Sequence, residues 1–336
     1  MKTLLTGGTG FLGGHVLDTL LRRGHSVLTT VRSDDKGKQL LADYPEIPKD
    51  KLDYVVVPDV AAPGAFSGLG PHGLEAVLHV ASPFHYNVTD VKKDLIDPAV
   101  LGTTGILKAI KESCPAVKRV VITSSFAAIL DMGVAQRGEK KTYSEADWSP
   151  VTLEDAMANP GMAYIGSKKL AEQAAWDFVE KEKPAFTLST INPPMIYGPV
   201  RYHVKSLDSV NTSNQFLAEV LQGKHKDGLP VTGLPLWVDV RDVALAHVLA
   251  IERDEAAGKR FLLAAGHCSN VELVKAVWEN YPDLRDKLPE EKNWGGAPSP
   301  VPDSFGFDRS RVDSVFGIEF IPYEKTIIDS VKSLIA

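Results

Sequence analysis

The chain has 336 residues, of which 44% are hydrophobic and 24% are charged, a balance typical of a globular protein with about two domains or lobes. Its net charge of −6 and its scattered lysine pairs predict neither nucleic acid nor an anionic membrane surface as a partner. Cys114 and Cys268 are its only cysteines, which excludes a disulfide framework and predicts a reducing, cytoplasmic location. The longest mostly apolar run, 120–130, is too short to span a bilayer, and we expect no signal-peptide core before the glycines that begin at Gly7.

Short runs rich in Val, Ile and Leu alternate with helical patterns through the first half of the chain. Apolar residues at helical spacing predict helices over 11–21, over 91–113 with a kink at Pro98, and over 162–183. Such alternation is typical of a parallel sheet covered by helices on both faces. The predicted strands are 3–6, 26–32, 52–57, 76–81, 117–125 and 186–191.

After Pro193 the regular alternation weakens, and Pro, Gly and His become more frequent. We predict helices over 214–221, 241–252 and 270–279, and one further strand over 259–264. The expected fold is an α/β fold of the Rossmann type, with a doubly wound parallel sheet and a smaller C-terminal lobe. We expect residues 1–193 to form the sheet domain and residues 194–336 the lobe, with some chain crossing back to the sheet.

A glycine-rich loop joins the first predicted strand to the first helix. Gly7, Gly10 and Gly13 give the spacing G-x-x-G-x-x-G, which allows a tight turn, a close approach of backbone to a diphosphate, and close packing of helix on strand. The amides and the positive end of the helix would then face the anion. The alternative is a strand-to-helix turn without a ligand. We predict a dinucleotide site that also includes Thr9, Phe11 and Leu12.

The end of the second predicted strand is where a residue that reads the adenosine ribose is expected. Arg32 stands there, with Lys36 four residues later. The planar fork of an arginine suits a phosphate, so these two cations favour NADP over NAD. Asp34 and Asp35 are a competing signal, because a carboxylate can bind ribose hydroxyls instead.

A candidate catalytic group lies on the long predicted helix. Tyr164 and Lys168 are four residues apart and therefore share a helix face. The fifth predicted strand ends at Ser125, and strand carboxyl ends line the ligand crevice of a doubly wound sheet. Reduction of a carbonyl needs a proton at oxygen, and a nearby Lys⁺ lowers the pKa of a tyrosine toward neutrality. We therefore predict Tyr164 as the proton donor, Lys168 as the residue that lowers its pKa, and Ser125 as the residue that orients the carbonyl.

Together these residues resemble the extended short-chain dehydrogenase/reductase family over nearly the whole chain. The segments 80–83, 123–125 and 191–194, with Arg32, look like its dihydroflavonol-reductase-like branch, and most like fungal NADPH-dependent aldehyde and ketone reductases. The stretch 97–102 lacks the Asn that many members carry for a proton relay, so the resemblance does not extend to that relay. It implies further cofactor contacts at Asp59, Val60, Ala81, Ser82, Pro83, Lys168 and the segment from Pro193 to Ile196.

The resemblance implies NADPH as cofactor and an NADP-binding domain that carries the catalytic residues, with residues 194–336 as the substrate-binding lobe. We expect an uncharged, partly apolar aldehyde or ketone as substrate, no metal ion, and either a monomer or a homodimer. Alternatives are a sugar-nucleotide epimerase or dehydratase, a hydroxysteroid-type dehydrogenase, and a non-enzymatic redox sensor that binds NADP. Candidate walls of the substrate pocket, chosen for nearness to the motifs, are Phe84, Phe126, Met162, Tyr202 and Val204.

Overall fold

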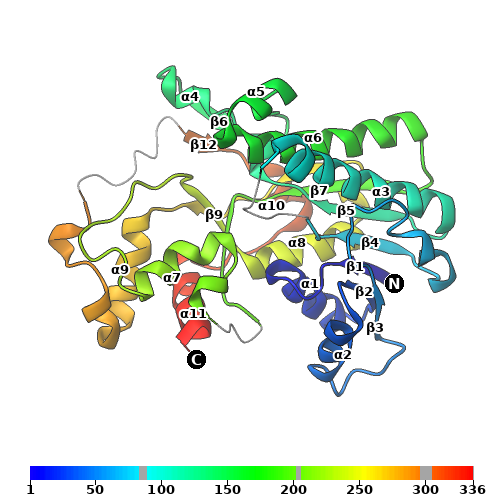
Figure 1. Cartoon of the computed structure of the whole chain (residues 1–336), viewed down its shortest axis with the longest axis horizontal. Coiled ribbons are helices and arrows are strands. Elements are labelled where there is room, and N and C mark those ends of the chain that lie inside the picture. Colours follow the sequence, from blue (N-terminus) through cyan, green and yellow to red (C-terminus); the bar gives the residue numbers. More distant parts are fainter. Residues whose placement is uncertain (83–88, 202–205, 296–304, 336) are drawn as a thin grey trace.

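The computed structural model describes residues 1–82, 89–201, 206–295 and 305–335. Within these residues a seven-stranded parallel sheet forms the centre of the molecule, in the order β10-β7-β5-β4-β1-β2-β3 (Figure 1). The expected α/β fold with a doubly wound parallel sheet is confirmed. The strands of this sheet are β1 (Lys2–Thr6), β2 (Ser26–Val31), β3 (Leu52–Val56), β4 (Ala76–His79), β5 (Arg119–Thr123), β7 (Thr187–Asn192) and β10 (Arg260–Leu262).

The order of the strands reverses at β1, which pairs with β2 on one side and with β4 on the other. In open α/β sheets a ligand crevice forms at this point, outside the carboxyl ends of the strands. The glycine loop follows β1 directly, Arg32 follows β2, and Ala81 and Ser82 follow β4. The fold therefore brings the predicted cofactor residues to one edge of the sheet.

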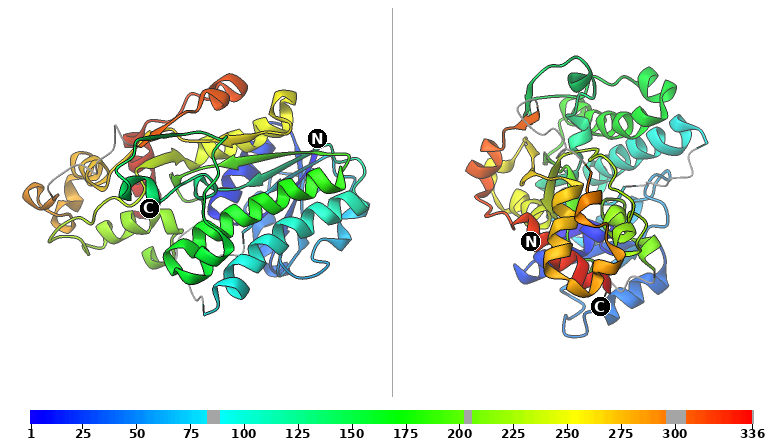
Figure 2. Two further views of the ribbon diagram at one scale, coloured as in Figure 1. Left: turned by 90° about the horizontal axis from the view of Figure 1, so that it is seen from above. Right: turned by 90° about the vertical axis from the view of Figure 1, so that its left-hand side faces the viewer.

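Helices cover both faces of the sheet: α1 packs with α8 on one face, and α3 packs with α6 on the other (Figure 2). The principal helices are α1 (Phe11–Arg22), α2 (Asp34–Ala42), α3 (Asp97–Ser113), α4 (Gly133–Gln136), α5 (Leu153–Ala158), α6 (Pro160–Glu182), α7 (Gln215–Leu221), α8 (Val240–Glu252), α9 (Asn270–Asn280), α10 (Ser310–Phe316) and α11 (Tyr323–Ile335). Shorter helical turns are η1 (Ser67–His72), η2 (Lys92–Ile96), η3 (Phe126–Ala128), η4 (Leu207–Ser209), η5 (Thr212–Asn214), η6 (Asp254–Ala256), η7 (Pro282–Lys287) and η8 (Glu291–Asn293).

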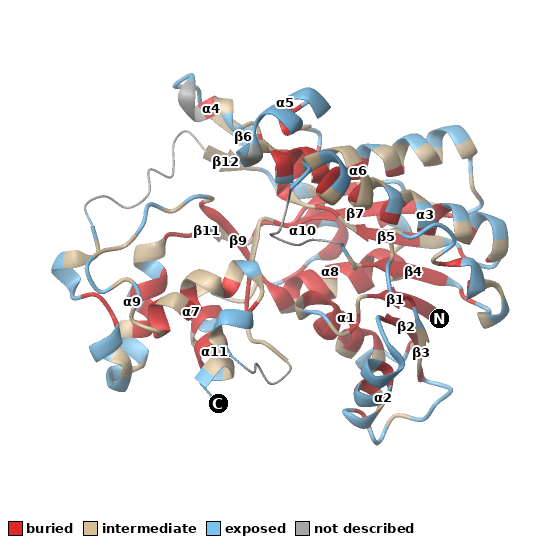
Figure 3. Ribbon diagram, viewed as in Figure 1, coloured by how far each residue is buried: buried red, intermediate tan, exposed pale blue. Residues whose placement is uncertain are grey.

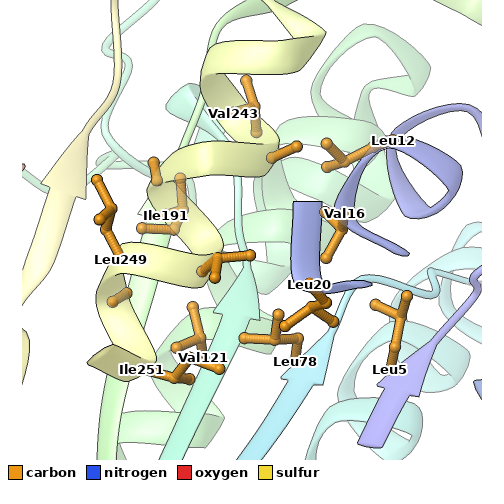
Figure 4. Packing of buried hydrophobic residues seen from close by; sticks show 14 of the residues in the cluster. Leu5, Leu12, Val16, Leu20, Leu78, Val121, Ile191, Val243, Leu249 and Ile251 are labelled. Carbon is orange, nitrogen blue, oxygen red and sulfur yellow. The ribbon is translucent and has the colours of Figure 1, made fainter. Parts of the chain in front are cut away.

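The core between the sheet, α1 and α8 is built from aliphatic side chains that are almost fully removed from water (Figure 3). Each such side chain stabilises the fold by roughly 1.5–3 kcal/mol relative to an exposed position. Apolar residues recur along α1 at helical spacing, which is why this helix lies flat on the sheet. Figure 4 shows how the side chains of the three elements meet, among them Leu5, Val16, Leu20, Leu78, Val121, Ile191, Val243, Leu249 and Ile251.

Much of the chain after residue 194 forms a second unit beside the sheet. Its three-stranded sheet has the order β11-β9-β8, with bounds Gly266–His267, Leu236–Asp239 and Met195–Tyr197. Helices α7, α9 and α11 surround a separate apolar cluster there. Strand β9 leads directly into α8, and β10 pairs with β7, so parts of this half belong to the main sheet.

A two-stranded sheet near the start of α6 joins a late part of the sequence to an earlier one. There β12 (Phe305–Phe307) pairs in parallel with β6 (Lys141–Tyr143), next to the start of α6 (Figure 1). Phe305 packs its ring against Tyr143, with the ring centroids 4.9 Å apart. Residues that come late in the sequence therefore support the region that precedes the predicted catalytic helix.

Several predicted strands are longer than the observed ones, and for two of them the early end of the strand has a local cause. Strand β4 ends at His79 because the amides of Val80 and Ala81 donate to the hydroxyl of Thr6, at 3.1 and 3.0 Å, instead of to a neighbouring strand. Strand β5 ends at Thr123 because the hydroxyl of Ser125 caps η3. In the predicted helix 91–113, the turn before Pro98 is π-helical and α3 begins with Pro98 in its first turn, where its missing N–H costs nothing. No helix among the described residues is long and apolar enough to cross a membrane.

Two buried histidines, His79 at the end of β4 and His247 in α8, make the stability of the fold depend on pH. Burial lowers the pKa of both His79 and His247 to about 4. The unfolded chain binds a proton at each below about pH 6.5 and the folded chain does not, so each histidine destabilises the fold as the pH falls from 6.5 toward 4. Burial raises the pKa of Asp242 to about 7, which acts in the opposite direction. A comparison with a variant that lacks one histidine therefore isolates the effect.

We expect the free energy of unfolding of the wild type to lose about 2 kcal/mol between pH 7 and pH 5 relative to His247→Gln. The reason is that glutamine does not titrate in this range. Urea unfolding of the two proteins at the two pH values measures the difference. Parallel pH dependence of the two proteins would show that His247 is protonated in the fold.

Candidate active site

A large cavity of about 880 Å³ opens at the carboxyl edge of the sheet, between the sheet domain and the segments 194–196 and 211–213. Most of the residues predicted to bind the cofactor line it. These are Gly7, Thr9, Gly10, Phe11, Leu12, Gly13, Arg32, Lys36, Asp59, Val60, Ala81, Ser82, Tyr164 and Ile196.

The backbone of the glycine loop has a conformation that residues with side chains would not readily adopt at Gly7 and Gly13. Gly7 has a φ of +77°, and a Cβ on Gly13 would lie 1.9 Å from the carbonyl oxygen of Gly7. Helix α1 begins after Gly10, and no side chain caps its first amides. The loop thus presents backbone N–H groups and the positive end of a helix to the cavity, which fits a diphosphate.

Gly13→Ala is expected to weaken NADPH binding at least about 10-fold, because the new methyl group forces the loop away from its position and overpacking costs about 1–3 kcal/mol. Quenching of NADPH fluorescence measures the dissociation constant. Gly105→Ala is the matched control, since a Cβ on this exposed glycine of α3 would meet no other atom within 4 Å. The control should keep its affinity and gain up to about 1 kcal/mol of stability. Equal affinities for the two variants would contradict the role of Gly13.

Two cations lie at the end of the cavity where the adenosine ribose of a dinucleotide is expected. Arg32 and Lys36 both line it and are exposed, and among the described residues neither forms an ion pair. Ser33 caps α2 and so sets the direction of the turn that carries Lys36. The Asp34 carboxylate accepts from the Tyr54 hydroxyl at 2.6 Å and pairs with Lys38 at 2.7 Å, and it is not part of the cavity wall. The site therefore offers positive charge, which fits a 2′-phosphate.

The residues after β4 are held in place by Thr6. Its hydroxyl accepts from the amides of Val80 and Ala81 and contacts Nδ1 of His79 at 2.9 Å, which makes it the donor to that nitrogen. This buried network fixes the backbone that leads to Ser82. The Ser82 hydroxyl in turn accepts from Nζ of Lys168 at 2.9 Å. The end of β4 is thereby joined to the predicted catalytic helix.

Tyr164 and Lys168 lie one turn apart near the start of α6, whose first turn is capped by the side chain of Asn159. Lys168 Nζ lies 5.7 Å from the centroid of the Tyr164 ring. Tyr164 is 41% exposed and forms part of the wall of the large cavity. Lys168 lines a small adjoining cavity of about 30 Å³, together with Ser82 and Ser124. The phenol therefore has direct access to a ligand, while the ammonium group lies behind it.

Ser125 follows β5 and is partly buried at the start of η3, a turn that packs against α6. Its hydroxyl accepts from the amide of Ala127 at 3.1 Å. The amide of Phe126, the residue directly after Ser125, donates to the carbonyl of Pro193 at 2.9 Å. Neither Ser125 nor Pro193 is part of the wall of the large cavity. The predicted roles of Ser125 and Pro193 stay predictions.

Asp59 lies on the cavity wall, as predicted, and also has a local structural role. Its carboxylate accepts from the amide of Ala61 at 2.8 Å, which stabilises the turn after β3. One carboxylate oxygen thus fixes the loop, and the side chain still borders the space for a ligand.

The residues predicted as walls of the substrate pocket lie apart from one another. Phe126 is fully buried, with its ring edge-to-face against Tyr143 at 5.3 Å, and it does not line the large cavity, so its role as a pocket wall stays a prediction. Met162 lines a different groove, of about 310 Å³, with Met132 and Val151. Outside the described residues lie Pro83, Phe84, Tyr202 and Val204.

Several wall residues of the large cavity were not predicted. Thr30 and Val31 end β2, and Val57 and Pro58 follow β3, so the rule that ligands bind at strand carboxyl ends could have found them. The segment Asn211, Thr212 and Ser213 gives no such signal, because it lies in the second unit far along the chain. Its position is set by the Ser213 hydroxyl, which donates to the carbonyl of Ile196.

The fold, the glycine loop and the Tyr-Lys pair define a short-chain dehydrogenase/reductase. Residues 3–264 match the model of the NAD dependent epimerase/dehydratase family, and the chain belongs to this family. The resemblance inferred from the sequence is confirmed. The chain is 44% identical to "Ketoreductase azaE" of Aspergillus niger, an alignment that covers 99% of this chain and 97% of that protein.

Solved structures of reductases share the whole fold. The crystal structure of Gre2 from Candida albicans in complex with NADPH superposes with a TM-score of 0.92 at 38% identity, covering 100% of this chain and 98% of that one. The yeast methylglyoxal/isovaleraldehyde reductase Gre2 complexed with NADPH gives a TM-score of 0.91 at 32% identity, with the same coverage. Both of these relatives were solved with NADPH bound.

Proposed function

We propose that the protein is an NADPH-dependent carbonyl reductase that acts on an uncharged, partly apolar aldehyde or ketone. The observation that carries this proposal is the placement of Tyr164 in the wall of a dinucleotide-sized cavity, with the ammonium group of Lys168 beside its ring. The names of the relatives, a ketoreductase and a methylglyoxal/isovaleraldehyde reductase, support the same reaction class.

The residues that would hold the cofactor are those of the large cavity. The backbone of the loop from Gly7 to Gly13 would bind the diphosphate, and Arg32 and Lys36 would bind the 2′-phosphate. Lys168 and the segment from Pro193 to Ile196 would border the nicotinamide end. When bound, NADPH supplies the hydride for the carbonyl carbon.

The side chains of this chain would then provide the proton and the orientation. Ser125 would donate a hydrogen bond to the carbonyl oxygen, and Tyr164 would give that oxygen its proton as the alcohol forms. The positive charge of Lys168 stabilises the phenolate that remains. Because the ammonium group is tied to Ser82, the charge stays in place during the transfer.

The division of labour along the chain and the compartment are part of the proposal. Residues 1–193 would bind the nucleotide and carry the catalytic side chains, and residues 194–336 would supply most of the substrate-facing surface. A reducing compartment, the cytoplasm, suits a chain whose two cysteines are both free and buried.

The test is consumption of NADPH by the purified protein with aliphatic aldehydes, diketones, β-keto esters and aryl ketones, followed by chiral analysis of the alcohols. We expect turnover with several members of this panel and little with NADH. Nucleotide sugars are tested in the same assay as the alternative class of substrate. Turnover of nucleotide sugars alone would replace the proposal with the epimerase or dehydratase alternative, and NADPH binding without any turnover would favour the redox sensor.

A further inference from the structure

Behind the proposed catalytic residues lies a buried carboxylate, Glu172 of α6, which is 2% exposed. Its strongest partner is Arg260 of β10, whose Nε lies 2.6 Å from Oε1. The Arg260 guanidinium also donates to the carbonyls of Glu145 and Asp147, at 2.7 Å each. In the described part of the chain, the other donors to Glu172 are the side chains of Ser124, Trp176, Thr190 and Asn192.

An ion pair removed from water is expensive unless all its hydrogen-bonding capacity is used. Here the carboxylate accepts from side chains on every side, and the guanidinium stacks on the Trp148 ring at 3.7 Å. Such a satisfied buried network holds its members in one arrangement. The effect of this network on function depends on which part of the main chain it fixes.

Two of the five partners of Glu172, Asn192 and Ser124, connect it to Ser125. Nδ2 of Asn192 donates to Glu172 Oε2 at 2.6 Å and to the carbonyl oxygen of Ser125 at 3.2 Å. The neighbouring Ser124 donates its hydroxyl to the same carboxylate oxygen. One carboxylate therefore holds the side chain of Ser124 directly and the carbonyl of Ser125 through Asn192.

Glu172 also lies close to Lys168, on the helix that carries both Tyr164 and Lys168. It lies one helical turn after Lys168 on the same face of α6, and the two residues line the same small cavity of about 30 Å³ with Ser124. The helix that carries Tyr164 and Lys168 is thereby attached to the loop that carries Ser125.

We propose that Glu172 is a positioning residue for carbonyl reduction: through Asn192 and Ser124 it fixes Ser125 at the distance from Tyr164 and Lys168 that the reaction needs. This inference rests on the proposed reductase function. It predicts that the network acts on the chemical step through Ser125 and leaves cofactor binding alone, since Glu172 is not in the wall of the large cavity.

The decisive experiment is a double-mutant cycle between Asn192→Ala and Ser125→Ala. Asn192→Ala breaks the link to Ser125 and leaves the Glu172–Arg260 pair in place. Because small displacements of a positioned group cost large factors in rate, we expect kcat to fall about 10-fold with the KM for NADPH within about 2-fold of wild type. In the Ser125→Ala background, measured in single-turnover conditions, the same change should have less than about a 2-fold effect.

Glu172→Gln is expected to show the same pattern, with a lower midpoint of thermal unfolding because Arg260 loses its counter-ion. Ser189→Ala is the matched control: this buried hydroxyl of β7 donates to the carbonyl of Ala256 at 2.7 Å and does not touch Glu172. The control should lose stability and keep kcat. The dissociation constant of NADPH, from fluorescence quenching, should be unchanged in all three variants.

Each result of these experiments either supports or overturns the positioning role of Glu172. An unchanged kcat in Asn192→Ala, or an equal loss in the presence and absence of the Ser125 hydroxyl, would leave Glu172 a purely structural residue. If Glu172→Gln does not fold, Asn192→Ala alone gives the answer. Failure of the proposed function itself looks different, because the wild-type protein would then reduce no carbonyl compound in the panel.

Discussion

Tyr164→Phe is expected to lower kcat for carbonyl reduction by about 10²–10⁴-fold, the usual contribution of a positioned general acid. The substitution removes the proton donor and keeps the ring that forms part of the cavity wall. The alkoxide that forms during hydride transfer would then have to take its proton from water. The rate of NADPH consumption with the best aldehyde or ketone of the panel measures the loss.

The KM for NADPH should change little, since the ring and Lys168 remain. Tyr281→Phe is a suitable control, because its hydroxyl donates to the carbonyl of Ile328 in the second unit, at 2.8 Å, and does not border the large cavity. The control should keep kcat. A Tyr164→Phe protein with full reductase activity would require another proton donor.

Arg32→Ala is expected to raise the KM for NADPH by about 10- to 100-fold and to leave the KM for NADH within about 3-fold. Hydrogen bonds to a charged group contribute about 1.5–3 kcal/mol, and NADH lacks the phosphate that would receive them. The selectivity for NADPH should therefore fall by the same factor. Steady-state kinetics with both cofactors at saturating carbonyl substrate gives the two KM values.

Removal of one surface charge also changes the general electrostatic field, so a second variant is needed. Lys38→Ala removes an exposed cation from α2, the helix that follows Arg32, and this lysine pairs with Asp34 instead of facing the cavity. Its effect on the KM for NADPH should be below about 2-fold, since exposed pairs are screened by solvent. Equal losses for both cofactors in Arg32→Ala would remove the assignment to the 2′-phosphate.

The parts of the site that could be predicted from the sequence are those whose chemistry is local. The glycine loop needs only the spacing of Gly7, Gly10 and Gly13 after a strand. The Tyr164–Lys168 pair needs the period of a helix together with the strand that ends at Ser125. Arg32 was found from the length of one strand-helix-strand unit. In the fold, α2 was missed because its sequence is polar and contains Gly37, and its stability comes from packing against Tyr54 of β3.

The parts that could not be predicted depend on contacts between distant residues. Glu172 and Arg260 are 88 positions apart and meet only after β10 has joined β7. Asn211, Thr212 and Ser213 come to the cavity through the folding of the second unit. Phe126 was chosen for its nearness to Ser125 in the sequence, which does not reveal that its side chain packs in a core cluster.

The pairing of β12 with β6 affects the order in which parts of the protein can fold while the chain is still being synthesised on the ribosome. The sheet strands β1 to β7 leave the exit tunnel early and can pair as they emerge. Arg311 of α10, far along the sequence, donates to the carbonyl of Arg260 at 3.0 Å and pairs with Glu145 at 2.9 Å, beside the β12–β6 contact. The nascent chain can thus acquire its nucleotide-binding half well before α10 is synthesised, whereas the support behind Arg260 is complete only after α10 has left the tunnel.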